Sequence, residues 1–180
     1  PMTMGASQVC GFLKSDPSKA TPNLQFHVQP ISTDILGATK MHDFDGITPT
    51  IANIRPTSRG EINIISNDTR DKPKIKMNYL STQDDRDVAA KSLKIVRKIM
   101  LETKAFKKYE PEEYRPGIHI TNDEELVQAG SEHTQTIFHP VGTCKMGNGD
   151  DSVVDEKLKV RGVENLRVID ASIMPNITSG

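Results

Sequence analysis

Apolar and polar residues alternate along short segments in the first half of the chain. Within residues 23–30, Leu24, Phe26 and Val28 are apolar and the residues between them are polar. This period of two is typical of a half-buried β-strand, in which successive side chains point to opposite faces. We therefore expect a strand here, with His27 on its polar face. The short apolar run at 9–13 predicts another strand.

Further strand-like runs follow at 47–54, 61–66 and 74–79. Polar segments rich in turn-forming residues separate them, so we expect an antiparallel meander. Ile62 and Ile64 alternate with Ile65 on the opposite face, which predicts a sheet that is covered on both sides. Gly60 stands where a turn would require a positive φ angle.

The pattern changes to a helical period after these runs. Apolar positions recur every three or four residues up to Thr103, which predicts one long amphipathic helix. Ser81 and Thr82 are the candidate N-caps for this helix, and acidic residues fill its first turn. A second, shorter helix is predicted from a capping box at 121–125 to about Glu132.

Two strands are expected in the last third of the chain. Residues 134–138 predict a strand that leads into His139, and the apolar run 166–169 predicts a buried strand. The chain starts at Pro1 in mid-domain-like sequence and stops at Gly180 without a closing helix, so we expect truncation at both ends.

Charge and composition exclude several classes of function. Lys and Arg total 23 against 24 Asp and Glu, so no net field favours nucleic acid or anionic lipid. The 2 cysteines form no C-x-x-C motif, which indicates neither a disulfide scaffold nor a metal site. No apolar run approaches the roughly 18 residues of a membrane span. We expect a cytoplasmic protein without a transmembrane segment; peripheral membrane association of a longer enzyme stays open.

Candidate chemistry concentrates in the segment HPVGTCKMG that begins at His139. Pro140 and Gly142 constrain the backbone after this histidine, and Pro140 biases His139 toward an extended conformation. A histidine on rigid backbone can serve as a general base near neutral pH. A hydrolase triad of His139 with Ser172 and Asp170 is not supported, because the chain has no G-x-S-x-G elbow.

Sequence blocks in a fixed order carry a family resemblance. They are HPVGTCKMG at 139–147, VVD at 153–155, VRGV at 160–163 and LRVIDASIMP at 166–175, with GFL at 11–13, TPNLQFH at 21–27 and RPTSRG at 55–60 upstream. Together they resemble the C-terminal signature of glucose-methanol-choline (GMC) oxidoreductases, especially the choline dehydrogenase-like and alcohol dehydrogenase-like members. The resemblance covers essentially the whole chain.

The resemblance implies a division of the chain and a cofactor. It implies an α+β fold in which residues 1–138 would form the substrate-binding cap, an antiparallel sheet backed by helices. Residues 139–180 would belong to the FAD-binding domain of a longer enzyme. The cofactor FAD would be bound mainly by an N-terminal region that carries the G-x-G-x-x-G fingerprint, which this chain lacks. We therefore expect the missing FAD region to be the main partner of the chain.

The resemblance also implies roles for individual residues. His139 matches the catalytic histidine that accepts the hydroxyl proton while the α-carbon hydride moves to the flavin. Asp170 and Ala171 match positions that line the ribityl and pyrophosphate of FAD, Ile137 matches a cavity-lining position, and His27 falls near a substrate-cavity histidine. Alternative interpretations are a carboxylate that caps nearby amides for Asp170, a plain core position for Ile137 and a polar strand residue for His27.

The expected reaction is oxidation of the CH–OH group of choline or another primary alcohol by the full-length enzyme. The family's second catalytic position, His or Asn, falls immediately after Gly180, so we expect the 180-residue chain alone to be inactive. A free-standing ligand-binding or interaction module without redox chemistry is the alternative. The sequence leaves open the alcohol, the electron acceptor and the choice between dehydrogenase and oxidase.

Overall fold

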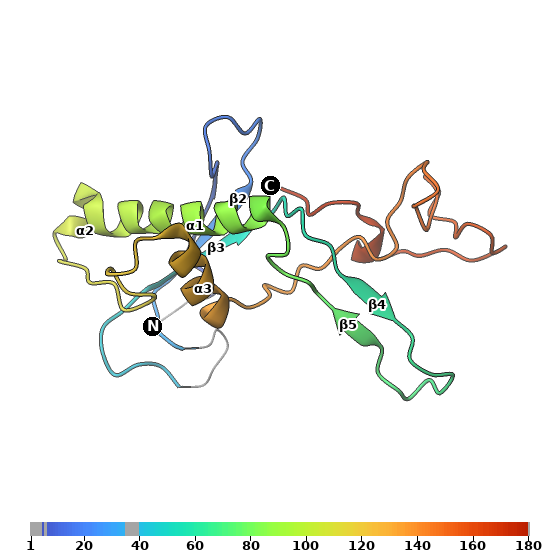
Figure 1. Cartoon of the computed structure of the whole chain (residues 1–180), viewed down its shortest axis with the longest axis horizontal. Coiled ribbons are helices and arrows are strands. Elements are labelled where there is room, and N and C mark those ends of the chain that lie inside the picture. Colours follow the sequence, from blue (N-terminus) through green and yellow to red (C-terminus); the bar gives the residue numbers. More distant parts are fainter. Residues whose placement is uncertain (1–4, 6, 35–39, 180) are drawn as a thin grey trace. The chain divides into compact units, whose positions relative to one another are not determined.

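The computed structural model describes residue 5, residues 7–34 and residues 40–179. The chain forms two compact units (Figure 1). Unit 1 comprises Pro1–Pro56 and Thr82–Gln135, and unit 2 comprises Thr57–Ser81 and Thr136–Gly180. The border between the units follows Gln135, and the domain boundary after residue 138 stays a prediction. Pro1 and Gly180, at which we expect truncation, lie outside the described residues.

Unit 1 contains a 3-stranded antiparallel sheet in the order β1-β2-β3. The strands are β1 (Val9–Leu13), β2 (Leu24–Gln29) and β3 (Thr48–Asn53), which confirms the strands predicted at 9–13, 23–30 and 47–54. Leu24 and Phe26 are buried, as the alternation predicts. His27 lies on the opposite face, paired with Cys10 of β1 and with Thr50 of β3.

The long helix begins where the sequence predicts. Helix α1 (Gln83–Arg97) is capped by Thr82, whose hydroxyl accepts a hydrogen bond from the backbone N–H of Asp85 at 3.3 Å. It continues into a π-helical turn, η1 (Lys98–Glu102), and is followed by the short helix α2 (Lys104–Lys107). The predicted helix extends to Thr103 and so includes η1, although its π-helical geometry is not predicted, and α2 is not predicted. Helix α1 packs against β3 and α3 (Figure 1).

Helix α3 (Asp123–His133) confirms the second predicted helix. Its cap differs from the prediction, because Asn122 rather than Thr121 accepts the N–H groups of Glu124 (2.9 Å) and Glu125 (3.3 Å). The buried apolar residues of unit 1 are Leu24, Phe26, Ile54, Val88, Ala90, Met100 and Leu126. Among the residues that the structure describes, none of the helices combines the length and apolar character needed to cross a membrane.

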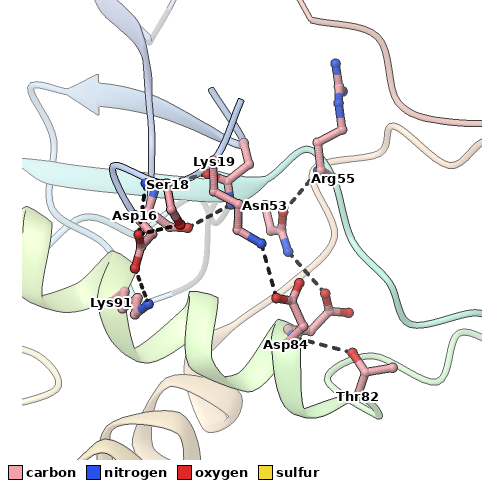
Figure 2. A network of polar contacts seen from close by, with 11 residues as sticks. Asp16, Ser18, Lys19, Asn53, Arg55, Thr82, Asp84 and Lys91 are labelled. Atoms are coloured by element: carbon pink, nitrogen blue, oxygen red, sulfur yellow. Dashed lines mark hydrogen bonds and ion pairs between the residues drawn. The ribbon is translucent and has the colours of Figure 1, made fainter. Parts of the chain in front are cut away.

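Ion pairs tie the loop between β1 and β2 to helix α1 (Figure 2). Lys91 contacts the Asp16 carboxylate at 2.8 Å, and Lys19 contacts Asp84 at 3.2 Å. The hydrogen bond from Lys91, helped by hydrogen bonds from Ser18, holds the pKa of Asp16 far below its ordinary value. These contacts fix the end of the hairpin on the first turns of the helix.

Unit 2 contains a 2-stranded antiparallel sheet formed by β4 (Glu61–Asn63) and β5 (Lys74–Lys76) (Figure 1). The strands predicted within 61–66 and 74–79 and their antiparallel pairing are confirmed, but the meander is wrong in its first strand, because β3 pairs with β2 in unit 1 and not with β4. Ile62 and Ile75 lie opposite each other and are 50% and 58% exposed. The predicted covered sheet is also wrong, because a ribbon of two short strands supplies no layer that would cover its faces.

Gly60 is required at the start of β4 for a reason other than the predicted one. Its φ angle is not positive. A Cβ atom added at this position would instead lie 2.3 Å from the backbone oxygen of Lys76. Glycine therefore permits the close approach of the two strands.

The remainder of unit 2 consists of turns and isolated bridges. Residues 134–138 and 166–169 are not strands, so both of these predictions are wrong. Residues 166–169 make only one bridge, between Lys159 and Arg167, and Ile169 is 75% exposed. A strand needs a continuous ladder of partners, and this segment has only that bridge and two flanking hydrogen bonds, from Val160 N–H to the Leu166 carbonyl (3.0 Å) and from Val168 N–H to the Leu158 carbonyl (3.2 Å). Val154 is the single buried apolar residue in the described part of unit 2.

Candidate functional site

The predicted site residues are divided between the two units. Ile137, His139, Asp170 and Ala171 lie in unit 2, and His27 lies in unit 1. Ile137 is half-buried, whereas His139, Asp170 and Ala171 are exposed. The residues around His139 therefore belong to unit 2.

The backbone on both sides of His139 is constrained. Phe138 has a φ of 62°, and its N–H donates to the Thr136 hydroxyl at 3.0 Å. A positive φ is uncommon for a residue other than glycine and marks a backbone that its surroundings determine. Pro140 has a fixed φ and restricts the preceding residue, His139, and Gly142 has a φ of 89°. The histidine is thus presented by a segment with few free torsions.

Asp170 introduces a tight turn rather than ending a strand. It has an extended backbone, with φ −153°, and precedes the 3-10 turn η2 (Ala171–Ile173). Its carboxylate accepts a hydrogen bond from the backbone N–H of Ser172 at 2.8 Å. Hydrogen bonds from Ser172, through its hydroxyl and its backbone N–H, lower the pKa of the Asp170 carboxyl. The geometry supports the capping interpretation, and contact of Asp170 with a cofactor stays a prediction.

The tertiary structure joins this turn to the segment after His139. The carbonyl oxygen of Ser172 accepts hydrogen bonds from the N–H groups of Gly142 (3.1 Å) and Cys144 (3.0 Å). The carbonyl oxygen of Ile173 accepts one from the N–H of Met146 at 2.8 Å. Two sequence blocks that are far apart in the chain thus form one backbone-paired structure.

Arg161 and Ser152 brace the far end of the same segment. The Arg161 guanidinium donates to the carbonyl oxygen of Gly147 at 2.7 Å and to the Ser152 hydroxyl at 3.1 Å. Ser152, only 6% exposed, donates to the same Gly147 oxygen at 2.9 Å. The sequence analysis assigned no role to either residue, although Arg161 belongs to the VRGV block.

The polar face of β2 carries unsatisfied groups. Nδ1 of His27 and Oε1 of Gln29 are buried without a hydrogen-bond partner among the described residues. The two side chains lie on the same face, because they are two positions apart in one strand. Gln29 is only 5% exposed and was not singled out from the sequence, although the same alternation places it beside His27. Buried polar atoms of this kind suit a ligand hydroxyl or an ordered water.

A metal centre finds no support in the described part of the chain. No group of three or more His, Cys, Asp or Glu side chains there is arranged to hold a metal ion.

Comparison with known proteins places the chain in a family. The model of the GMC oxidoreductase family matches residues 56–180. The chain belongs to the GMC oxidoreductase family. It is 42% identical over 170 residues to the oxygen-dependent choline dehydrogenase of Proteus mirabilis (strain HI4320), covering 94% of this GMC chain and 30% of the relative. It is 41% identical over 179 residues to an alcohol dehydrogenase (acceptor) of Pseudomonas putida, covering 99% and 32%.

Solved structures agree with this assignment. Pyridoxine 4-oxidase from Mesorbium loti superposes with a TM-score of 0.83 at 27% identity, over 97% of this GMC chain and 34% of that one. Formate oxidase superposes with a TM-score of 0.75 at 27% identity, over 87% and 28%. These matches confirm the predicted family and the α+β fold. The GMC chain spans 30% to 32% of the length of the two curated relatives named above.

Proposed function

We propose that this GMC chain forms the substrate side of an FAD-dependent oxidoreductase that oxidises the CH–OH group of an alcohol. The observation that carries the proposal is the pairing of the His139 segment with the turn at Asp170, through the carbonyl groups of Ser172 and Ile173. Two relatives are named as dehydrogenases of choline and of alcohols, which supports this reaction class.

His139 is the proposed proton acceptor. Its side chain is exposed and its backbone is constrained on both sides, so the imidazole is accessible from a defined position. Imidazole can accept the proton of a substrate hydroxyl near neutral pH. As that proton leaves, negative charge develops on the oxygen and weakens the adjacent C–H bond. When bound, FAD supplies the acceptor for the hydride of that bond.

The residues at the Asp170 turn fit the ribityl chain of FAD better than its pyrophosphate. The lowered pKa of Asp170 keeps its carboxylate ionised at neutral pH, and Oδ1 already accepts the N–H of Ser172. A carboxylate suits a hydroxyl of the ribityl chain and repels a pyrophosphate, because like charges repel. Ala171 is small and exposed, so a cofactor can approach its backbone. We assign Asp170 and Ala171 to the ribityl side, with the phosphates held by a region outside this chain.

His27, with Gln29 beside it in unit 1, is proposed as a polar contact for a ligand hydroxyl. Each has a buried polar atom that lacks a partner among the described residues, and a hydroxyl could satisfy either atom. Ile137, half-buried in unit 2, is proposed as an apolar wall of the substrate cavity. Choline is the first candidate substrate, because the relatives at 36% to 42% identity include choline dehydrogenases.

The decisive test uses the native-length protein that contains this chain. We expect a flavin absorption spectrum and reduction of an artificial electron acceptor by choline or by another alcohol of a screening panel. His139→Ala should lower kcat by roughly 10²- to 10⁴-fold, the usual contribution of a general base. His133→Ala is the matched control, since His133 is an exposed histidine at the end of α3. Unchanged turnover in His139→Ala would remove the assigned base, and a protein without flavin would favour the free-standing binding module.

A further inference from the structure

We propose that Asp170 is a positioning residue for His139, and that its carboxylate acts through the backbone of the turn it caps. The inference rests on the proposed function, in which His139 accepts the substrate proton. This role is separate from the proposed contact with the ribityl chain: the turn needs an oxygen acceptor at the cap position, and the cap itself does not need negative charge.

The turn that follows Asp170 depends on its cap. The turn Ala171–Ile173 is a single 3-10 turn, held by hydrogen bonds from Ile173 N–H to the Asp170 carbonyl (3.2 Å) and from Met174 N–H to the Ala171 carbonyl (3.1 Å). The bonding geometry of such turns is poor, and their first N–H groups lack internal partners. The Asp170 carboxylate supplies the partner for Ser172 N–H at 2.8 Å. The cap therefore determines the orientation of Ser172.

Ser172 forms hydrogen bonds through both of its backbone groups. Its N–H is held by Asp170, and its carbonyl oxygen accepts from both Gly142 and Cys144. The adjacent Ile173 carbonyl accepts from Met146. A rotation of the uncapped turn would therefore weaken the hydrogen bonds that hold the segment after His139.

The backbone between the hydrogen-bonded Gly142 and His139 is constrained. Pro140 has a fixed φ and Gly142 is held at φ 89° by its place in the loop. On the other side, Phe138 is held at φ 62° with its N–H on Thr136. A shift of the anchored Gly142 would consequently move the imidazole rather than be absorbed between the two residues.

A pair of substitutions separates the proposed role from a charge effect on a cofactor. Asp170→Asn keeps an acceptor oxygen at the same reach without the charge, and Asn is as good an N-cap as Asp. Asp170→Glu keeps the charge but moves it out of cap geometry. Asp170→Ala removes both the charge and the cap. Asp150→Ala, at an exposed carboxylate in unit 2, is the control.

The primary measurement is hydrogen exchange of the backbone amides of Gly142, Cys144 and Met146 in the native-length protein. We expect Asp170→Ala and Asp170→Glu to raise the exchange rates roughly five- to tenfold, the effect of losing a typical cap. Asp170→Asn and Asp150→Ala should remain close to the wild type. Peptides from α1 report whether unit 1 stays folded. If Asp170→Ala does not fold, the comparison of the Asn and Glu variants still tests the proposal.

Enzyme kinetics provide a second readout. In an alcohol-oxidising protein we expect Asp170→Glu to lower kcat about tenfold with little change in KM, and Asp170→Asn to lower kcat less than Asp170→Glu does. The reverse order, with Asn impaired and Glu normal in either exchange or kinetics, would overturn the proposal. Unchanged exchange in all three variants would overturn it as well. If no alcohol is oxidised, the proposed function fails while the exchange measurement still tests the link from Asp170 to the His139 segment.

Discussion

Arg97 and Glu113 form a bidentate ion pair that joins helix α1 to the connector before α3. Arg97 Nε lies 2.7 Å from Oε2 of Glu113, and Nη2 lies 2.8 Å from Oε1. The two side chains are only 13% and 10% exposed. Arg97 also donates to the carbonyl oxygens of Gly117 (2.9 Å) and Ile120 (2.7 Å), so one guanidinium fastens three parts of the connector to the helix.

Arg97→Ala should destabilise the chain strongly. It leaves the Glu113 carboxylate nearly buried without its cation, and breaking such a pair typically costs about 3–5 kcal/mol. Lys94→Ala is the matched control on the same helix, because its partner Asp123 is a surface carboxylate and such pairs contribute about 0–1 kcal/mol. Urea unfolding followed by circular dichroism measures both. Equal losses in the two variants would show that the Arg97 network is dispensable.

Asp16 should give unit 1 an acid-sensitive contribution to stability. The hydrogen bond from Lys91 lowers the pKa of Asp16 in the folded chain. The pair therefore stabilises the fold above the unfolded-state pKa of about 3.9, and this contribution is lost as the pH falls through the lowered folded-state pKa. Asp16→Asn should be less stable than the wild type at neutral pH, and the two should converge in strong acid.

Thermal unfolding from neutral pH down to about pH 2 measures this convergence. Asp43→Asn serves as the control, because Asp43 is an exposed carboxylate in the loop before β3. A constant difference in melting temperature between Asp16→Asn and the wild type at every pH would contradict the ion pair with Lys91.

Gln29→Met should stabilise the chain in the absence of a ligand. The substitution keeps the size of the side chain and removes a buried oxygen without a partner among the described residues, a group whose burial costs about 1–3 kcal/mol. Gln25→Met on the same face is the control, since Gln25 is only half-buried and makes a long contact of 3.8 Å to Cys10 Sγ. Chemical denaturation measures both. A destabilised Gln29→Met would show that loss of the hydrogen bond from Gln29 Nε2 to the Ser7 hydroxyl (3.4 Å) outweighs removal of the unpaired Oε1.

The 180-residue chain by itself should neither retain FAD nor oxidise alcohols. The chain has no G-x-G-x-x-G fingerprint, so it lacks the usual backbone cradle for the cofactor phosphates. The absorption spectrum after incubation with FAD and desalting measures retention, with the native-length protein as the positive control. A stoichiometric flavin spectrum in the short chain would contradict this expectation.

Local patterns predicted the elements of unit 1 well. The strand alternation around Leu24 and Phe26 and the helical period after Thr82 depend on residues close in sequence. They can therefore be recognised from the sequence alone. The N-cap of α1 was predicted for the same reason, because Thr82 contacts the N–H of a residue in the next turn. In unit 2 the same reasoning failed at residues 134–138 and 166–169, because strand formation there depends on partners that an apolar run does not specify.

The sequence by itself determined which residue types are available for chemistry: His139 before a rigid proline, Asp170 before small residues, and blocks in an order that indicates the GMC family. The tertiary structure alone decided that Ser172 connects them, because its contribution is a backbone carbonyl oxygen. Every residue carries that group, so no side-chain pattern reveals which one is used. The link between Asp170 and the His139 segment could therefore be found only from the folded backbone.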